Sequence, residues 1–280
     1  MIEIPESLVL ANQLNQVLKE RTVADVTAWQ SPHKLAFIYG DPSAYGNLFK
    51  GQTFERARGF GSWVEIQFKD AVLAVSEGTR LFHTKDEKEL PKKHQMLLKF
   101  DDGSFMGAAV KMYGAVVGAR PGEYDNKYYL VAQEKPAVFS KEFSSSYFKS
   151  MIDEEGVQKL SLKAFLATEQ RIPGLGNGVL QDILFNSRLH PKEKVKDVTE
   201  KQRYFLYQTL VSTLKDMTGQ DGRDTEKDLF GNYGGYQTKM SAKTKNQPCP
   251  VCGTPIVKAS YMGGSIYFCP KCQPLSSRKK

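Results

Sequence analysis

Cysteine is absent from the first 248 residues of this 280-residue chain, and only four cysteines follow. No apolar run approaches the roughly 18 residues that a membrane-spanning helix needs, and the chain has neither internal repeats nor low-complexity tracts. Its start, Met1-Ile-Glu-Ile-Pro-Glu6, lacks the basic and apolar stretches of a secretory signal peptide. These absences argue against a membrane protein and a disulfide-rich secreted domain, and they predict a cytoplasmic protein without a membrane partner.

The chain does carry an excess of positive charge. Its formal net charge is +8, with 40% apolar and 25% charged residues, the composition of an ordinary globular protein. A basic surface favours a polyanionic partner, because each neutralised phosphate releases counterions. Many basic proteins bind no polyanion, so the charge alone is a weak indication.

The four cysteines form two close pairs. Cys249-Pro-Val-Cys252 and Cys269-Pro-Lys-Cys272 lie sixteen residues apart, and two such pairs supply the four thiolates of a closed structural zinc site. The segments 256–261 and 265–268 between the pairs predict a β-hairpin. Two disulfides are the alternative, but a reducing compartment favours one structural Zn²⁺.

Patterning along the chain predicts an α+β protein of several domains. An apolar stripe from Leu8 to Leu18 predicts an N-terminal helix that starts at Pro5-Glu6-Ser7. Short apolar segments then predict a β-sandwich or barrel, with Asp101-Asp-Gly103 as a hairpin turn. The predicted strands cover residues 34–38, 63–68, 71–75, 95–100 and 104–110.

Helical periodicity follows from about residue 126, over residues 142–151, 161–169, 177–187 and 199–217. Leu206, Leu210 and Leu214 predict a core-facing stripe on the last of these helices. Residues 219–245 form a polar, glycine-rich connector, which is commonly functional or mobile. We therefore predict a sandwich domain over 1–125, a helical domain over 126–240, and a zinc finger with a basic tail over 241–280.

One loop between two predicted helices is rich in glycine. It reads Arg171-Ile-Pro-Gly-Leu-Gly-Asn177-Gly, and its glycines let the backbone pass close to a ligand at the N-terminus of the next helix. Asn177 adds an amide donor, which predicts a phosphate contact. Close packing of two helices explains the glycines equally well.

Three features in order along the chain resemble one family. They are the start Met1-Ile-Glu-Ile-Pro-Glu6, the loop Ile172-Pro-Gly-Leu-Gly-Asn177, and the finger with its sixteen-residue gap. Together they resemble the formamidopyrimidine-DNA glycosylase and endonuclease VIII family over nearly the whole chain. The resemblance implies an N-terminal β-sandwich, a helix-two-turns-helix module that contains Asn177, a zinc finger and a DNA-binding cleft.

The resemblance also implies a chemistry. In the family, a damaged base is flipped from the duplex, and the amine of an N-terminal proline attacks C1′ of its sugar while a glutamate moves protons. Glu3 and Glu6 match the family's two glutamates, whereas Ile2 stands in the place of the proline. A retained Met1 then offers a primary amine, and both glutamates can equally serve to start the helix.

Further family positions are matched in part. Arg58-Gly-Phe60 lies where the family has Arg-Gly-Lys, so a lysine that contacts DNA is replaced by Phe60. Lys111 and Tyr113 match residues that fill the gap left by the flipped base. Gly264 stands where a finger arginine contacts phosphate.

The resemblance and its departures predict a monomer that binds damaged or abasic duplex DNA, and they leave two functions open. One is a DNA glycosylase and abasic-site lyase that uses an altered N-terminal amine. The other is a protein that binds damaged DNA without cutting it, which the missing proline, lysine and arginine favour. A zinc-finger protein that acts on RNA or on another protein is a third alternative.

Overall fold

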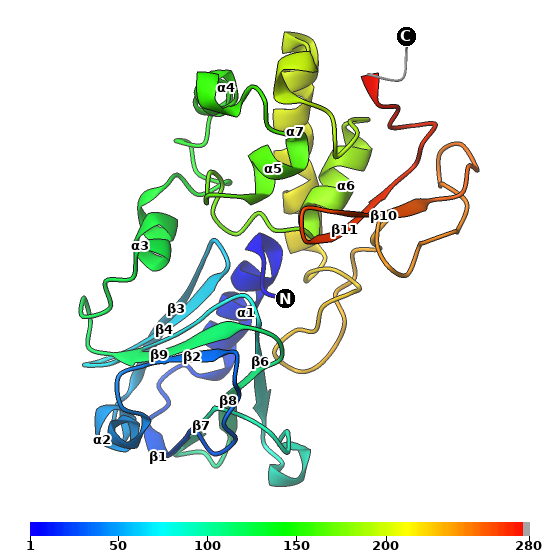
Figure 1. Cartoon of the computed structure of the whole chain (residues 1–280). Helices are drawn as coiled ribbons and strands as arrows, with labels where there is room; N and C mark the ends of the chain where they lie inside the picture. The colour runs from blue at the N-terminus through cyan, green and yellow to red at the C-terminus, as the bar shows by residue number, and fades with distance from the viewer. Residues whose placement is uncertain (277–280) are drawn as a thin grey trace. The chain divides into compact units, whose positions relative to one another are not determined.

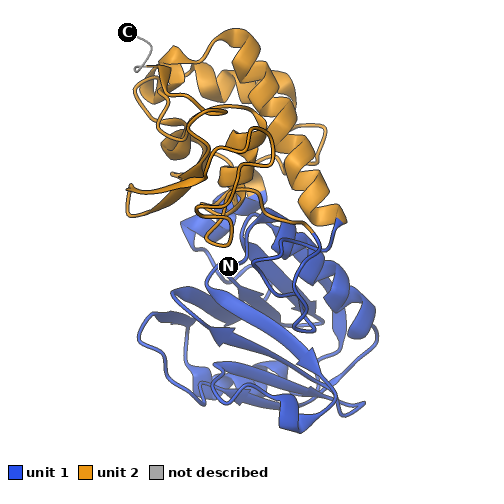
Figure 2. Cartoon of the chain, turned by 90° about the vertical axis from the view of Figure 1, so that its right-hand side faces the viewer, with its two compact units in different colours: residues 1–133, 220–235 blue, residues 134–219, 236–280 orange. Residues whose placement is uncertain are grey.

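The computed structural model describes residues 1–276, so the last four residues of the predicted basic tail lie outside the described part of the chain. The chain divides into two compact units (Figure 2). Unit 1 comprises Met1–Gln133 and Gln220–Gly235, and unit 2 comprises Glu134–Gly219 and the chain from Tyr236 onward. The predicted division into three domains, with boundaries at residues 125 and 240, is not tested by this division into two units and stays a prediction.

Unit 1 is a β-sandwich with an N-terminal helix, as predicted (Figure 1). One sheet has the strand order β1-β7-β8-β6 and the other β2-β9-β5-β4-β3, and the β2–β9 pair alone among these neighbours is parallel. Both sheets and α1 contribute to one apolar core. The elements are α1 (Ile4–Val17), β1 (Val23–Ala28), β2 (Ala36–Tyr39), α2 (Tyr45–Phe49), β3 (Phe54–Phe60), β4 (Trp63–Phe68), β5 (Val72–Val75), β6 (Thr79–Thr84), β7 (Met96–Phe100), β8 (Phe105–Val110), β9 (Gly114–Ala119) and α3 (Lys127–Glu134).

The predicted N-terminal helix is confirmed as α1, and it lies directly on β3. Leu14 and Leu18 are fully buried, and the side chain of Asn15 pairs with both backbone groups of Ala57, at 2.9 Å and 2.8 Å. Gly59 of β3 faces the backbone of Ser7 so closely that an added Cβ would lie 2.3 Å from its carbonyl oxygen. A residue without a side chain is therefore required at this helix-sheet contact.

The five predicted strands are confirmed as β2, β4, β5, β7 and β8, with ends shifted by at most two residues. Asp101-Asp-Gly103 joins β7 to β8, and Gly103 has the expected positive φ of 82°. The sequence patterns missed β1, β3, β6, β9 and the short helices α2 and α3. In β3, at the edge of its sheet, two arginines and a glycine interrupt the apolar alternation. The glycine faces α1, and the exposed arginines pair with Gln67 and Glu65 of β4.

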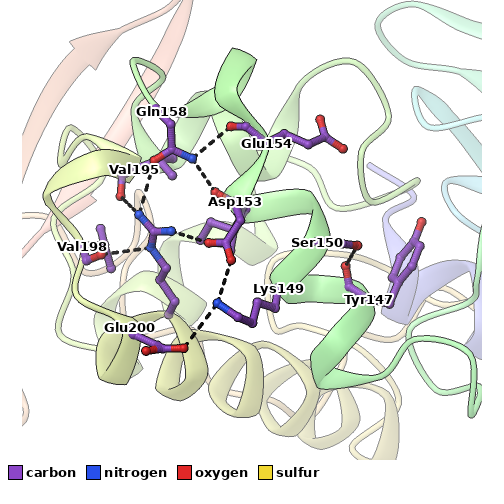
Figure 3. Close-up of polar contacts among 11 residues, drawn as sticks. Tyr147, Lys149, Ser150, Asp153, Glu154, Gln158, Val195, Val198 and Glu200 are labelled. Carbon is purple, nitrogen blue, oxygen red and sulfur yellow. Dashed lines mark hydrogen bonds and ion pairs between the residues drawn. The ribbon is translucent and has the colours of Figure 1, made fainter.

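Unit 2 contains the four predicted helices, with shifted ends, and the predicted finger hairpin. Leu206, Leu210 and Leu214 are fully buried, which confirms the core-facing stripe on α7. At the start of that helix, Lys149 lies between Asp153 and Glu200, with Nζ 2.7 Å and 3.3 Å from their carboxylates (Figure 3). The elements are α4 (Ser145–Asp153), α5 (Leu162–Ala167), α6 (Val179–Asn186), α7 (Glu200–Gly219), β10 (Val257–Tyr261) and β11 (Gly264–Phe268). None of the described helices is both long and apolar enough to cross a membrane.

The contact between α1 and β3 can be tested with Gly59→Ala. The new Cβ would collide with backbone atoms that no side-chain rotation can move, so we expect a loss of about 1–3 kcal/mol in the free energy of unfolding, measured by urea denaturation. Gly46→Ala in α2 is the control, because its Cβ meets nothing within 4 Å. We expect it to be neutral or stabilising by up to about 1 kcal/mol. Equal effects of the two substitutions would contradict this packing.

Candidate functional site

The first two residues of the chain are held at the edge of the sandwich. Ile2, at the position of the family's proline, is 3% exposed and donates its backbone N–H to Glu77 O at 2.8 Å. Met1 is 39% exposed, and its α-ammonium group forms an ion pair with the carboxylate of Glu226. The α-amine of Met1 thus lies one residue beyond the position of the proline, beside a carboxylate.

Glu3 and Glu6 are buried and share one arginine. Glu3 caps α1 in a reciprocal capping box with Glu6. Arg223, from the segment that returns to unit 1, donates to both Glu6 carboxylate oxygens at 2.8 Å and 2.7 Å and lies 3.3 Å from the Glu3 carboxylate. Burial acts to raise the pKa of Glu6, but the charge and hydrogen bonds of Arg223 outweigh it and lower that pKa. Glu6 is therefore held as an anion, and both carboxylates belong to one ion-pair cluster around Arg223.

A cavity of about 470 Å³ opens beside Met1. Its wall includes Glu226 and the turn between β8 and β9, where Lys111 is exposed. Tyr113, at the end of this turn, is 52% exposed. Burial and a hydrogen bond to Glu77 raise the pKa of the Tyr113 hydroxyl. The structure thus brings together the predicted residues Met1, Lys111 and Tyr113 around the N-terminus.

Arg58, in contrast, is engaged within the β3–β4 hairpin. Its guanidinium donates to buried Glu65 at 2.9 Å and 2.6 Å and lies over the ring of Phe60. Phe60 in turn contacts the ring of Tyr129, with centroids 5.5 Å apart. The hairpin tip is therefore an apolar contact within unit 1 at the position where the family places a lysine.

Asn177 lies at the start of α6 and contacts the finger hairpin. Its Nδ2 donates to Ser265 O at 3.0 Å, and Gln181 Nε2 donates to the same carbonyl at 3.1 Å. Next to it, an added Cβ on Gly264 would meet Lys163 Nζ at 3.3 Å and Asn177 Nδ2 at 3.8 Å. Lys163 is buried and donates to Tyr261 O at 2.7 Å. The place of the family's finger arginine thus borders a buried lysine and the amide of Asn177.

The four cysteines lie together at the base of the finger, and all four Sγ atoms are within 4.8 Å of one another. None is disulfide-bonded. The Cys249–Cys272 and Cys252–Cys269 sulfur atoms are 3.8 Å and 3.4 Å apart, close to the spacing of about 3.8 Å that a tetrahedron with 2.3 Å metal–sulfur bonds gives. Gly253, after the second cysteine, has the expected positive φ of 72°.

The electrostatics of these thiols also fit a metal ion. Hydrogen bonds from Thr254 lower the pKa of Cys252 to about 6. Burial and the neighbouring thiols raise the pKa of Cys272 to about 12. Four sulfur atoms this close cannot all become thiolates without a cation among them. The four cysteines therefore form a group that can bind a metal ion.

Sequence patterns missed Arg223, Glu226 and Glu77 as members of the N-terminal site. The one available signal was the polar, glycine-rich connector, which contains the charged run Arg223-Asp-Thr-Glu-Lys227. Nothing in that run indicates which distant residues it contacts. Arg223 and Glu6 are 217 residues apart in the chain.

The ion-pair cluster leads to a stability prediction for Arg223→Met. Removing the cation leaves two buried carboxylates without its compensating charge, so we expect a loss of about 3–5 kcal/mol at neutral pH, measured by urea unfolding. Arg56→Met is the control, because Arg56 is exposed on β3, and we expect a change within about 0.5 kcal/mol.

The same pair of proteins gives a pH dependence with a defined sign. The lowered pKa of Glu6 stabilises the wild type above the ordinary value of 4.5, and this contribution disappears as the pH falls through the lowered pKa of the folded state. In Arg223→Met, protonation removes the uncompensated charge instead. The difference in stability between wild type and variant should therefore shrink as the pH falls from 7, and it should go on shrinking below that ordinary value. A constant difference from pH 7 to pH 4 would contradict the role of this ion pair.

No family model matches the chain, but individual proteins match it over nearly its full length. The formamidopyrimidine-DNA glycosylase of Bacillus licheniformis is 28% identical, with 98% of this chain and 99% of the relative covered. The glycosylase of the same name from Cytobacillus firmus is 26% identical, with 98% and 100% covered.

Solved structures agree on the fold. The crystal structure of the MutM (Fpg) protein from Thermus thermophilus matches with a TM-score of 0.80 and 21% identity, over 98% of this chain and 99% of that one. A Lactococcus lactis Fpg in complex with DNA that contains an abasic site matches with a TM-score of 0.81 and 18% identity, over 97% and 99%. The matching motifs, the full-length relatives and this fold support the assignment of the chain to the formamidopyrimidine-DNA glycosylase family, and the chain has isoleucine at position 2, where the family resemblance implies a proline.

Proposed function

We propose that this chain is a DNA repair protein that binds damaged or abasic duplex DNA and acts on it through the α-amine of Met1. The observation that carries the proposal is the position of this amine, which lies at the wall of the cavity beside a carboxylate. The names of the relatives describe DNA glycosylases, and one matched structure holds abasic DNA. An amine beside a cavity is the group that an abasic-site lyase requires.

The proposed reaction is covalent catalysis. A neutral α-amine can attack the aldehyde carbon of an opened abasic sugar and form an imine with loss of water. The imine makes the neighbouring C2′ proton acidic, so that elimination of the 3′ phosphate breaks the strand. A primary amine suffices for this chemistry, although it lacks the ring that fixes the geometry of proline.

The DNA-contacting residues in this proposal lie in both units. In unit 1, Lys111 and half-exposed Tyr113 supply a cation and an aromatic ring at one turn, which suits an opened base stack. Arg58 keeps 44% of its side chain exposed beside its ion pair with Glu65. In unit 2, Asn177 at the glycine-rich start of α6 supplies an amide donor for a phosphate.

We assign the four-cysteine group to one structural Zn²⁺. Cys249, Cys252, Cys269 and Cys272 would hold the ion, and its role would be to hold the finger together. We further propose a monomer in the cytoplasm, where the thiols stay reduced.

A second function, binding of damaged DNA without cleavage, is favoured by a different observation. Ile2 is buried with its N–H bonded to Glu77, and the Glu3 carboxylate is held by Arg223. A chain with this arrangement would keep the residues proposed to contact DNA, but it would lack an N-terminal amine placed for attack on the sugar.

The two functions are separated by trapping with borohydride on duplex DNA that contains one abasic site. We expect a covalent adduct and strand cleavage, with peptide mass spectrometry placing the adduct on the Met1 α-amine. Acetylation of that amine should abolish the adduct and leave binding of the duplex intact. Tight binding without any adduct would instead establish the second function.

The metal assignment has its own test. We expect about one zinc per chain by elemental analysis, and removal of zinc with a chelator should unfold the finger and weaken DNA binding at least tenfold, because the finger cannot fold alone. Adding back zinc should restore binding. Unaltered affinity of the zinc-free protein would exclude the finger from the DNA-binding surface.

A further inference from the structure

The returning segment Gln220–Gly235 supplies the charged partners of the N-terminal residues. Asp228 accepts a hydrogen bond from Gln13 of α1 at 3.0 Å, and Leu229 is fully buried in the core of the sandwich. The carbonyl of Leu229 also accepts the backbone N–H of His83 at 2.9 Å. These contacts fix the segment to α1 and β6, so its side chains are held in place beside the start of the chain.

Within this segment, Arg223 occupies the two glutamates that match the family's N-terminal pair. Glu3 and Glu6 are 3% and 5% exposed, and each faces the same guanidinium. A carboxylate that is buried and paired with an arginine is a poor proton acceptor, because its protonation would leave the arginine charge uncompensated. Proton transfer at the Met1 amine therefore requires another group.

Glu226 is in contact with that amine and retains access to solvent. Its carboxylate pairs with the Met1 ammonium, and 27% of its side chain is exposed. The other charged groups that line the cavity are Glu6, Glu77, Arg80, Lys111 and Lys227. The charge of Arg223 also acts on Glu226, but its hydrogen bonds go to Glu6. Of the two other carboxylates, Glu6 is paired with Arg223, and Glu77 hydrogen-bonds to Tyr113.

We propose that Glu226 is the general base of the Met1 amine, and that the acid–base role has moved from Glu3 to the returning segment. This inference rests on the proposed function, since it concerns the same amine. A group within hydrogen-bond reach of the proton that it removes meets the first geometric requirement of a general base.

The step balances in protons and electrons. The Met1 ammonium transfers one proton to the Glu226 carboxylate, and the freed nitrogen lone pair forms a bond to C1′ of the aldehyde. The addition product passes a proton from nitrogen to oxygen, and Glu226 returns its own proton to the same hydroxyl, which leaves as water. Ammonium and aldehyde have then become iminium and water, and Glu226 is again a carboxylate.

Glu226→Gln tests this assignment, because the amide still accepts a hydrogen bond from the amine but cannot take its proton. We expect the single-turnover rate of borohydride-trapped adduct on abasic duplex DNA to fall about tenfold or more, with the Kd for the same duplex within about twofold. Raising the pH should recover much of the loss, because solvent then removes the proton. Glu226→Asp, which retains a carboxylate, should lie between the variant and the wild type.

Glu55→Gln is the matched control, since Glu55 is exposed on β3, and its rate should equal that of the wild type. An adduct that forms at the wild-type rate in Glu226→Gln, with an unchanged pH profile, would overturn this inference and leave the proposed function standing. Failure of the wild type itself to form an adduct would refute the amine chemistry, whatever the variants do. Circular dichroism of each variant separates a loss of rate from a loss of fold.

Discussion

The buried charge of Arg223 is the constraint on which the N-terminal half of this protein depends. A guanidinium that is 3% exposed has to be paired, and its partners are Glu3 and Glu6 at the first turn of α1. Since Arg223 follows α7, the chain has to return from unit 2 to complete unit 1. One ion-pair cluster thus fixes the start of the first helix, the path of the returning segment and the setting of the α-amine.

This constraint explains how isoleucine is accommodated at position 2. Ile2 joins the core of the sandwich, so apolar packing anchors the backbone at the N-terminus. The α-amine of Met1 lies one residue further out, where it pairs with Glu226 and not with a helix-capping glutamate. The burial of Ile2 and the contact between the Met1 amine and Glu226 of the returning segment are two parts of one arrangement.

The sequence predicted those features that depend on residues close together in the chain. Four cysteines at close spacing were enough for the metal-binding group, and apolar alternation located β4 and the β7–β8 hairpin, because neighbouring residues decide these features. The strand β3 escaped detection, since Gly59 is required by the backbone of α1 and the two exposed arginines pair with Gln67 and Glu65 of β4. The pairing of Arg223 with Glu6 escaped for the same reason, because no local pattern joins residues 217 positions apart.

The two other departures from the family fit their surroundings closely. Phe60, in the place of a lysine, contacts Tyr129 within an aromatic cluster and lies under the Arg58 guanidinium. Gly264, in the place of an arginine, leaves room for the buried ammonium of Lys163, which any side chain at that position would approach within 3.3 Å. Each altered position is thus packed beside a cation of its own unit: half-exposed Arg58 lies over Phe60, and buried Lys163 lies beside Gly264.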